Sequence, residues 1–174
     1  MRSFGFTLVE LLTTLSISAI LVAVGLPNFF KQIQKSRVET AMLSLQESLQ
    51  FTRISAVSTN KRATIASLVM WEEGWEVFID LNNNGSREPN EDVLKQGEKL
   101  NGIRISATGP VENYVSYIGT GEGEKANGRT GGAFQAGTFT ICPETKGGGY
   151  KLTLARGGRV RKDEITEREC EAKR

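Results

Sequence analysis

The chain has 174 residues, with 22 Lys and Arg against 20 Asp and Glu, no His and two Cys. This length is enough for one domain with a buried core. The absence of histidine excludes a Ser-His-Asp triad, a histidine general base and a histidine-ligated metal, and two cysteines are too few for a four-cysteine zinc site. The formal net charge of +2 gives no indication that the chain as a whole binds nucleic acid.

An uncharged, mainly apolar run of 20 residues lies between Glu10 and Lys31. As a helix it would span roughly 30 Å, which is the thickness of the hydrocarbon core of a bilayer. The run is longer than the apolar region of a secretory signal, and no Ala-x-Ala cleavage site follows it. We therefore expect a single membrane anchor that the mature protein keeps at its N-terminus.

Glu10 stands at the start of this run, where a carboxylate in hydrocarbon is costly unless it is paired. The simplest interpretation is a charge at the helix start, lying at the membrane interface. The segment Gly5-Phe6-Thr7-Leu8-Val9-Glu10, however, resembles the class III signal of type IV pilins and pseudopilins. The resemblance implies that a prepilin peptidase cleaves after Gly5 and that Phe6 is then N-methylated. It also implies that Glu10 pairs with the N-terminal amine of a neighbouring subunit during filament assembly.

A second apolar pattern continues beyond the run. Pro27 is expected to kink the helix or to interrupt a few of its hydrogen bonds. Apolar residues then recur at spacings of three and four, which predicts an amphipathic helix to about Val57. Together the two segments form one helix of roughly fifty residues, far longer than the globular average.

Short β-like segments follow from Lys61 onward, separated by turn-rich stretches at 82–90, 119–132 and 146–149. The glycine-rich spacing without intervening helical periods favours antiparallel pairing. We therefore predict an α+β protein with the type IV pilin fold, in which a long N-terminal helix packs on an antiparallel sheet. The predicted strands are 63–70, 75–80, 93–96, 103–106, 114–118, 138–142, 150–155 and 159–162.

One turn-rich stretch matches the pattern of a calcium-binding loop, with Asp80, Asn82, Asn84 and Glu91 at the ligand positions. The context is wrong for an EF-hand, because a predicted strand precedes the loop and Pro89 interrupts its second half. Asn-Gly is also a strong hairpin signal. We expect a structural hairpin, as in the GspH/FimT group of minor pilins that this segment resembles, and keep calcium as the weaker alternative. No other cofactor is expected.

Cys142 and Cys170 are the two thiols of the chain. Because an exported domain meets an oxidising compartment, we predict a disulfide between them. Such a bridge would stabilise the fold by roughly 3–4 kcal/mol in the chain-entropy model. A reactive free thiol is the alternative, but no histidine is available to activate it.

A block of basic residues without intervening acids lies inside this disulfide loop. Alternation along a strand would place Arg159 and Arg161 on one face, where two guanidinium groups suit successive phosphates. The simpler interpretation is a solvated strand that pairs with acids such as Glu164 or Glu167. The segment Gly158-Arg159-Val160-Arg161 resembles the C-terminal G-R-x-R of FimT-like and FimU-like minor pilins. In FimT-like members this motif is associated with DNA binding during natural transformation. The candidate DNA-binding residues are Lys146, Lys151, Arg156, Arg159, Arg161 and Lys162.

The resemblance divides the chain into a leader peptide (1–5), a transmembrane and filament-core helix (6–27), the amphipathic half of that helix (28–58) and a β-rich domain (59–174). It implies a non-enzymatic minor pilin in the bacterial inner membrane, with a periplasmic C-terminal domain, that later enters a pilus filament or its tip. The implied partners are prepilin peptidase, other minor and major pilins and, through the basic tail, duplex DNA. The alternative is a GspH-like minor pseudopilin of a type II secretion system.

Overall fold

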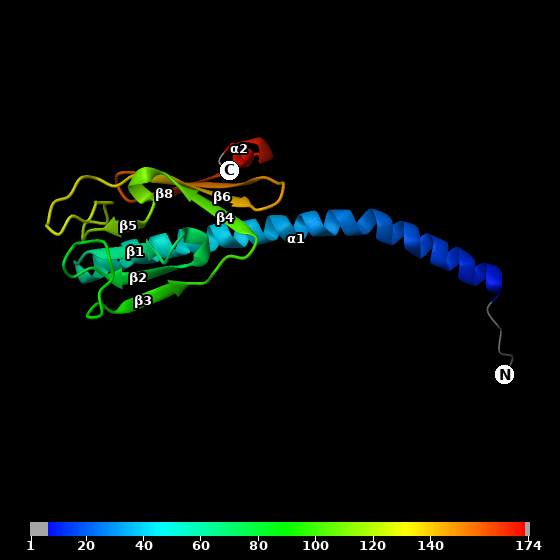
Figure 1. The fold of residues 1–174 in the computed structure, drawn as a ribbon, viewed down its shortest axis with the longest axis horizontal. Coiled ribbons are helices and arrows are strands. Elements are labelled where there is room, and N and C mark those ends of the chain that lie inside the picture. The colour runs from blue at the N-terminus through cyan, green and yellow to red at the C-terminus, as the bar shows by residue number, and fades with distance from the viewer. Residues whose placement is uncertain (1–6, 173–174) are drawn as a thin grey trace. The chain divides into compact units, whose positions relative to one another are not determined.

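The computed structural model describes residues 7–172 (Figure 1). The chain divides into two compact units, one ending at Ser36 and the other formed by Arg37–Arg174. Helix α1 (Leu8–Thr59) supplies the described part of the first unit and continues into the second. The long helix is therefore confirmed, and it ends within two residues of the predicted end.

Helix α1 begins at a capping box formed by Thr7 and Glu10. The Glu10 carboxylate accepts hydrogen bonds from the Thr7 backbone N–H (3.3 Å) and hydroxyl (3.2 Å), while the Glu10 N–H donates to the Thr7 hydroxyl at 3.2 Å. These bonds satisfy donors that a helix start otherwise leaves free. The helix then continues without a break through Pro27. Among residues 7–172, no helix is both long and apolar enough to cross a membrane.

The second part of α1 buries one face against the β-strands of its own unit (Figure 1). Residues on this face recur every three or four positions, so they form a single stripe along the helix. Each of them is at most 2% exposed: Val38, Ala41, Met42, Leu45, Leu49 and Ala56.

All eight predicted segments form strands, and all of their pairings are antiparallel. They form two four-stranded sheets, however, and not the single sheet that was expected. The first sheet has the order β3 (Val93–Gly97), β2 (Trp75–Ile79), β1 (Ala63–Ser67), β5 (Tyr114–Tyr117). The second has the order β4 (Ile103–Ala107), β6 (Gly137–Pro143), β7 (Gly149–Leu154), β8 (Val160–Ile165).

Three short helical elements were not predicted. Two are 3-10 turns, Trp71–Glu73 and Gly109–Val111, and the third is helix α2 (Glu167–Glu171). The first 3-10 turn lies just beyond β1, which ends at Ser67 and not at the predicted position 70. Its Trp71 is buried, packs edge-to-face on Phe139 with ring centroids 5.0 Å apart, and so connects the two sheets.

One core joins the buried face of α1 to one face of each sheet. We call the face of a sheet that carries these core side chains its inner face, and the opposite face its outer face. The inner face of the first sheet contributes Ile65, Trp75, Val77, Val115 and Tyr117, and that of the second contributes Ile103, Ile105, Phe139, Ile141, Leu152 and Leu154.

A buried arginine holds the loops at one end of the first sheet. Arg62 is 5% exposed and donates to the Asn83 side chain (2.9 Å), the Ser116 hydroxyl (2.7 Å) and the Glu124 backbone carbonyl (2.8 Å). Its guanidinium also forms an ion pair with the Glu124 carboxylate at 2.5 Å. Because these partners come from three separate segments, Arg62 connects the β2–β3 connection and the 119–132 stretch to β5.

The ion pair makes the fold sensitive to acid. Partial burial alone would raise the pKa of Glu124. Hydrogen bonds from Gly132, Arg62 and Gly131, together with the positive charge of Arg62, outweigh the effect of burial, so the pKa of Glu124 is lowered. A carboxylate whose folded pKa lies below its unfolded value stabilises the fold above the unfolded pKa of about 4.3. That stabilisation is lost as the pH falls through the folded pKa.

We predict that Glu124→Gln lowers the free energy of unfolding at neutral pH by on the order of 3 kcal/mol, because it leaves the Arg62 charge buried without a carboxylate. Thermal unfolding between pH 7 and pH 3 measures this, and the variant should lose less stability on acidification than the wild type. Glu122→Gln, at an exposed neighbouring position, is the control and should change stability little. If the stability of wild type and of Glu124→Gln fell equally with pH, the stabilising role assigned to the ion pair of Arg62 and Glu124 would be contradicted.

Candidate functional site

The proposed processing site lies at the start of the chain. Gly5 and Phe6 lie outside the described residues. Glu10 is exposed and takes part in the capping box with Thr7. The structure thus gives Glu10 a local role at the helix start, and its role in assembly stays a prediction.

The candidate calcium ligands lie in the connection between β2 and β3. Asp80 and Glu91 are each 2% exposed. Asp80 accepts hydrogen bonds from the backbone N–H groups of Asn84 (3.1 Å) and Gly85 (2.9 Å). Glu91 accepts from the N–H groups of Leu81 (2.7 Å) and Glu88 (3.0 Å). Both carboxylates therefore cap the backbone of their own loop.

The two asparagines act in the same way. Asn82 Oδ1 accepts from the Asn84 N–H at 3.1 Å, and Asn84 Oδ1 accepts from the Ser86 N–H at 2.7 Å. These are Asx turns, the local bonds that asparagine favours in tight connections. Within residues 7–172, no group of three or more His, Cys, Asp or Glu side chains is arranged to hold a metal ion. The contacts favour the structural interpretation of this loop.

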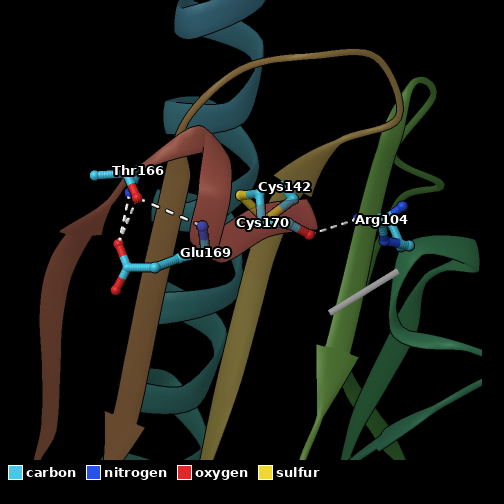
Figure 2. Close-up of a disulfide and its surroundings, with 5 residues drawn as sticks. All are labelled: Arg104, Cys142, Thr166, Glu169 and Cys170. Carbon is cyan, nitrogen blue, oxygen red and sulfur yellow. Dashed lines mark hydrogen bonds between the residues drawn. A yellow bond between two sulfur atoms is a disulfide. The ribbon is translucent and has the colours of Figure 1, made fainter. Parts of the chain in front are cut away.

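The predicted disulfide joins Cys142 of β6 to Cys170 of α2, with the two Cα atoms 5.8 Å apart (Figure 2). Helix α2 begins at a capping box. The Thr166 hydroxyl accepts from the Glu169 N–H at 3.4 Å, and the Glu169 carboxylate accepts from the Thr166 N–H at 2.8 Å. Arg104 of β4 donates to the Cys170 carbonyl at 3.2 Å. The spacing of Thr166 and Glu169 is the sequence signal that would have predicted this helix.

Gly149 shows where α2 lies on the second sheet. A Cβ atom at this glycine would lie 2.8 Å from the Cys170 sulfur and 3.2 Å from the Cys142 sulfur. The bridge therefore passes directly over the backbone of β7. The strand can approach the disulfide this closely only because the position has no side chain.

The register of β7 and β8 decides which basic side chains share a face. Lys162 pairs with Leu152, which is buried in the core, so Lys162 belongs to the inner face. Arg161 pairs with Thr153, and both belong to the outer face. Lys151 lies on that outer face as well, two positions before Thr153.

The pairing of the two strands extends into the turn that connects them. The Ala155 N–H donates to the Arg159 carbonyl at 2.9 Å, one step beyond the pair of Leu154 and Val160. If alternation continues along this extension, Arg159 shares the face of Arg161. We call Lys151, Arg159 and Arg161 the outer cationic face.

The other basic residues of the block lie elsewhere. Arg156 is in the turn after β7, where its guanidinium carbon lies 4.1 Å from the ring centroid of Phe134. Lys146 is in the turn before β7, at the other end of the strand. The six basic residues predicted to contact DNA therefore do not form one patch, because strand alternation and two opposite turns separate them.

Gly158, the first residue of the G-R-x-R motif, has a structural role that sequence reasoning missed. It has φ +77°, and a Cβ atom would overlap the Gly121 carbonyl oxygen and lie 3.1 Å from the Tyr117 ring. Arg53 of α1 links the two segments that meet at Gly158, because it donates hydrogen bonds to the carbonyls of Gly121 (2.8 Å) and Gly157 (3.2 Å). The helix thus anchors the turn that carries the two arginines of the motif.

Comparison with known proteins supports the predicted family. The family model described as "Type II transport protein GspH" matches residues 41–158, and the model described as "Prokaryotic N-terminal methylation motif" matches residues 1–26. The first match ends at Gly158, so Arg159 and Arg161 lie beyond it. No curated protein matches the chain.

Two crystal structures of the type IV minor pilin FimU of Pseudomonas aeruginosa have a similar fold. One is 20% identical over 74% of this chain and 89% of that chain, with a TM-score of 0.59. The other is 20% identical over 72% of this chain and 91% of that chain, with a TM-score of 0.54. At this identity the likeness shows the pilin fold alone.

We predict that Gly158→Ala destabilises the domain by about 1–2 kcal/mol through the left-handed backbone alone, with the overlap at Gly121 adding to this. Gly157→Ala is the matched control. That glycine is exposed, a Cβ atom there meets nothing within 4 Å, and its φ lies outside the left-handed range. Thermal unfolding of the two variants measures the difference. Equal melting temperatures would contradict the close approach of the turn to Gly121.

Proposed function

The chain belongs to the GspH family, and from that premise we propose that it is a minor pilin of a type IV pilus, anchored in the inner membrane before it joins the filament. Family and fold are those of pilin structural subunits and not of enzymes. As a pilin-like subunit, the chain has other pilins as its partners.

The exposed apolar surface of α1 before Ser36 is the observation that carries this proposal. Large apolar side chains stand out from the helix, between 48% and 76% exposed: Leu8, Val9, Leu11, Leu12, Leu15, Ile17, Ile20, Leu21, Val22, Leu26, Phe29 and Phe30. A surface of this extent marks a membrane or protein contact. Lipid covers it in the inserted state and neighbouring helices cover it in the filament.

The polar side chains within this segment fit an apolar environment. The hydroxyls of Thr13, Thr14, Ser16 and Ser18 donate to backbone carbonyls three or four residues earlier, at 2.7–3.0 Å. They therefore place no unpaired donor in lipid or in a packed helix bundle. Residues 6–27 would form the filament core and residues 28–58 the amphipathic half, with the periplasmic domain after them.

Processing would prepare the helix start for assembly. Prepilin peptidase would remove residues 1–5, and methylated Phe6 would then stand directly before the capping box of Thr7 and Glu10. A carboxylate has about four acceptor positions, so bonds from Thr7 leave capacity for a neighbouring subunit's amine. The Glu10 carboxylate and the neighbouring subunit's amine would both lose their hydration in an apolar filament core. Each charge would then need the other as its partner.

The outer cationic face supports duplex DNA as a further partner. Lys151 and Arg161 belong to the outer face of the second sheet, and Arg159 would extend that face at the turn. There the three cations would meet phosphates without reading bases. A GspH-like pseudopilin of a type II secretion system is the second candidate, and the description of the matching family model favours it. Pilus-assembly or secretion genes beside the coding sequence would separate the two.

We predict that Glu10→Ala leaves cleavage intact but strongly reduces the amount of the chain in sheared pili, because the amine of the neighbouring subunit loses its partner. Immunoblots of membranes and pili measure both steps. Glu39→Gln, an exposed charge on the same helix, is the control and should assemble normally.

A substitution of Gly5 should block processing. Mature-size protein from a Gly5 variant in purified pili would disprove the assignment.

We predict that the full-length chain in detergent micelles binds duplex DNA with steep salt dependence, and that Arg159→Gln with Arg161→Gln lowers the salt slope by up to about 1.8. Fluorescence anisotropy over a salt series measures this. The control is Lys146→Gln with Lys162→Gln, which removes the same charge from outside the outer cationic face. Equal decreases in DNA affinity and salt slope in the two double variants would contradict a role for the outer cationic face.

A further inference from the structure

Acidic side chains lie among the cations of the outer cationic face. The Arg161 Nε atom lies 3.2 Å from an Asp163 carboxylate oxygen, and Asp163 is the next residue of β8 on that face. Lys151 is the cross-strand partner of Asp163. Side chains of directly paired residues have Cβ atoms roughly 5 Å apart. One carboxylate therefore neighbours two of the three cations.

Helix α2 adds further acids at the end of the same face. The disulfide holds it over Gly149, and Gly149 is two positions before Lys151 in β7. The pKa of Glu169 is lowered, first by the backbone and side-chain hydrogen bonds from Thr166 and further by the charge of Lys151. Lys151 thus has Glu169 and Asp163 as acidic neighbours.

We propose that Asp163, together with α2, holds the outer cationic face partly neutralised, and that Asp163 sets the affinity of this face for a DNA phosphate backbone. The inference rests on the proposed DNA contact. A phosphate oxygen and the Asp163 carboxylate compete for the same N–H donors of Arg161, so DNA binding requires the phosphate to displace the carboxylate. Arg159, at the end of the face away from α2, would make the first contact.

Removing the charge of Asp163 should strengthen binding. Arg161 is 72% exposed, and ion pairs at such positions are weak, so Asp163→Asn should raise the affinity for duplex DNA about two- to fivefold. The variant also makes one more cation available to phosphates, which should steepen the salt slope by up to about 0.9. Glu169→Gln, which keeps a side chain suited to the capping box, should give a smaller gain.

The experiment measures the binding of a short mixed-sequence duplex DNA to the full-length, disulfide-bonded chain in detergent micelles, over a salt series. The variant is Asp163→Asn, and the control is Glu98→Gln, an exposed acid between β3 and β4 that gives the same change in net charge. The inference predicts tighter binding and a steeper slope for Asp163→Asn only. In an Arg161→Gln background most of the gain should disappear, because Lys151 is then the one neighbouring cation that Asp163→Asn can release.

Each other outcome has a distinct meaning. If Asp163→Asn binds no better than Glu98→Gln, while loss of Arg159 and Arg161 abolishes binding, the inference is overturned and the DNA contact stands. If neither wild type nor Asp163→Asn binds duplex DNA, the proposed DNA contact fails and the inference fails with it. A gain that persists undiminished in the Arg161→Gln background would overturn the role assigned to the pair of Arg161 and Asp163.

Discussion

The rest of the structure depends on one constraint, which is that α1 carries more apolar surface than its own domain covers. From Val38 to Ala56 the helix buries a stripe against two sheets, and this contact forms the core. From Leu8 to Phe30 the described apolar side chains stay exposed within the chain. This 52-residue helix thus gives one unit a core of its own and leaves the apolar side chains of the other exposed, so that they call for a partner. Membrane insertion and filament assembly are two ways of meeting that need.

The β-rich unit holds its loops with buried polar contacts and close glycines. Arg62 joins three segments at one end of the first sheet, and Arg53 joins the 119–132 stretch to the turn between β7 and β8. The disulfide fixes α2 to the opposite part of the second sheet. These contacts hold the turn after β7 against α1 and helix α2 against the second sheet.

Much of the fold could be predicted because its signals are local. Runs of β-branched and aromatic residues between turn-rich stretches indicated every strand, and the Asn84-Gly85 turn indicated the hairpin between β2 and β3. The division into two sheets could not be predicted, because it depends on which distant strands pair, as β1 does with β5. The capping box of Thr166 and Glu169 was a local signal for α2 that was overlooked.

The candidate site was only partly predictable for the same reason. Strand alternation separates Arg161 on the outer face from Lys162 on the inner face, whereas Lys146 and Arg156 lie in turns that no alternation governs. The structural role of Gly158 depends on Gly121 and on a helix far away in sequence, so no local pattern reveals it. Mass spectrometry of the chain recovered from purified pili tests the central claim most directly. We expect the mass of a disulfide-bonded chain that begins at N-methylated Phe6. A chain that retains Met1–Gly5, or that is absent from pili assembled in its presence, would contradict the account.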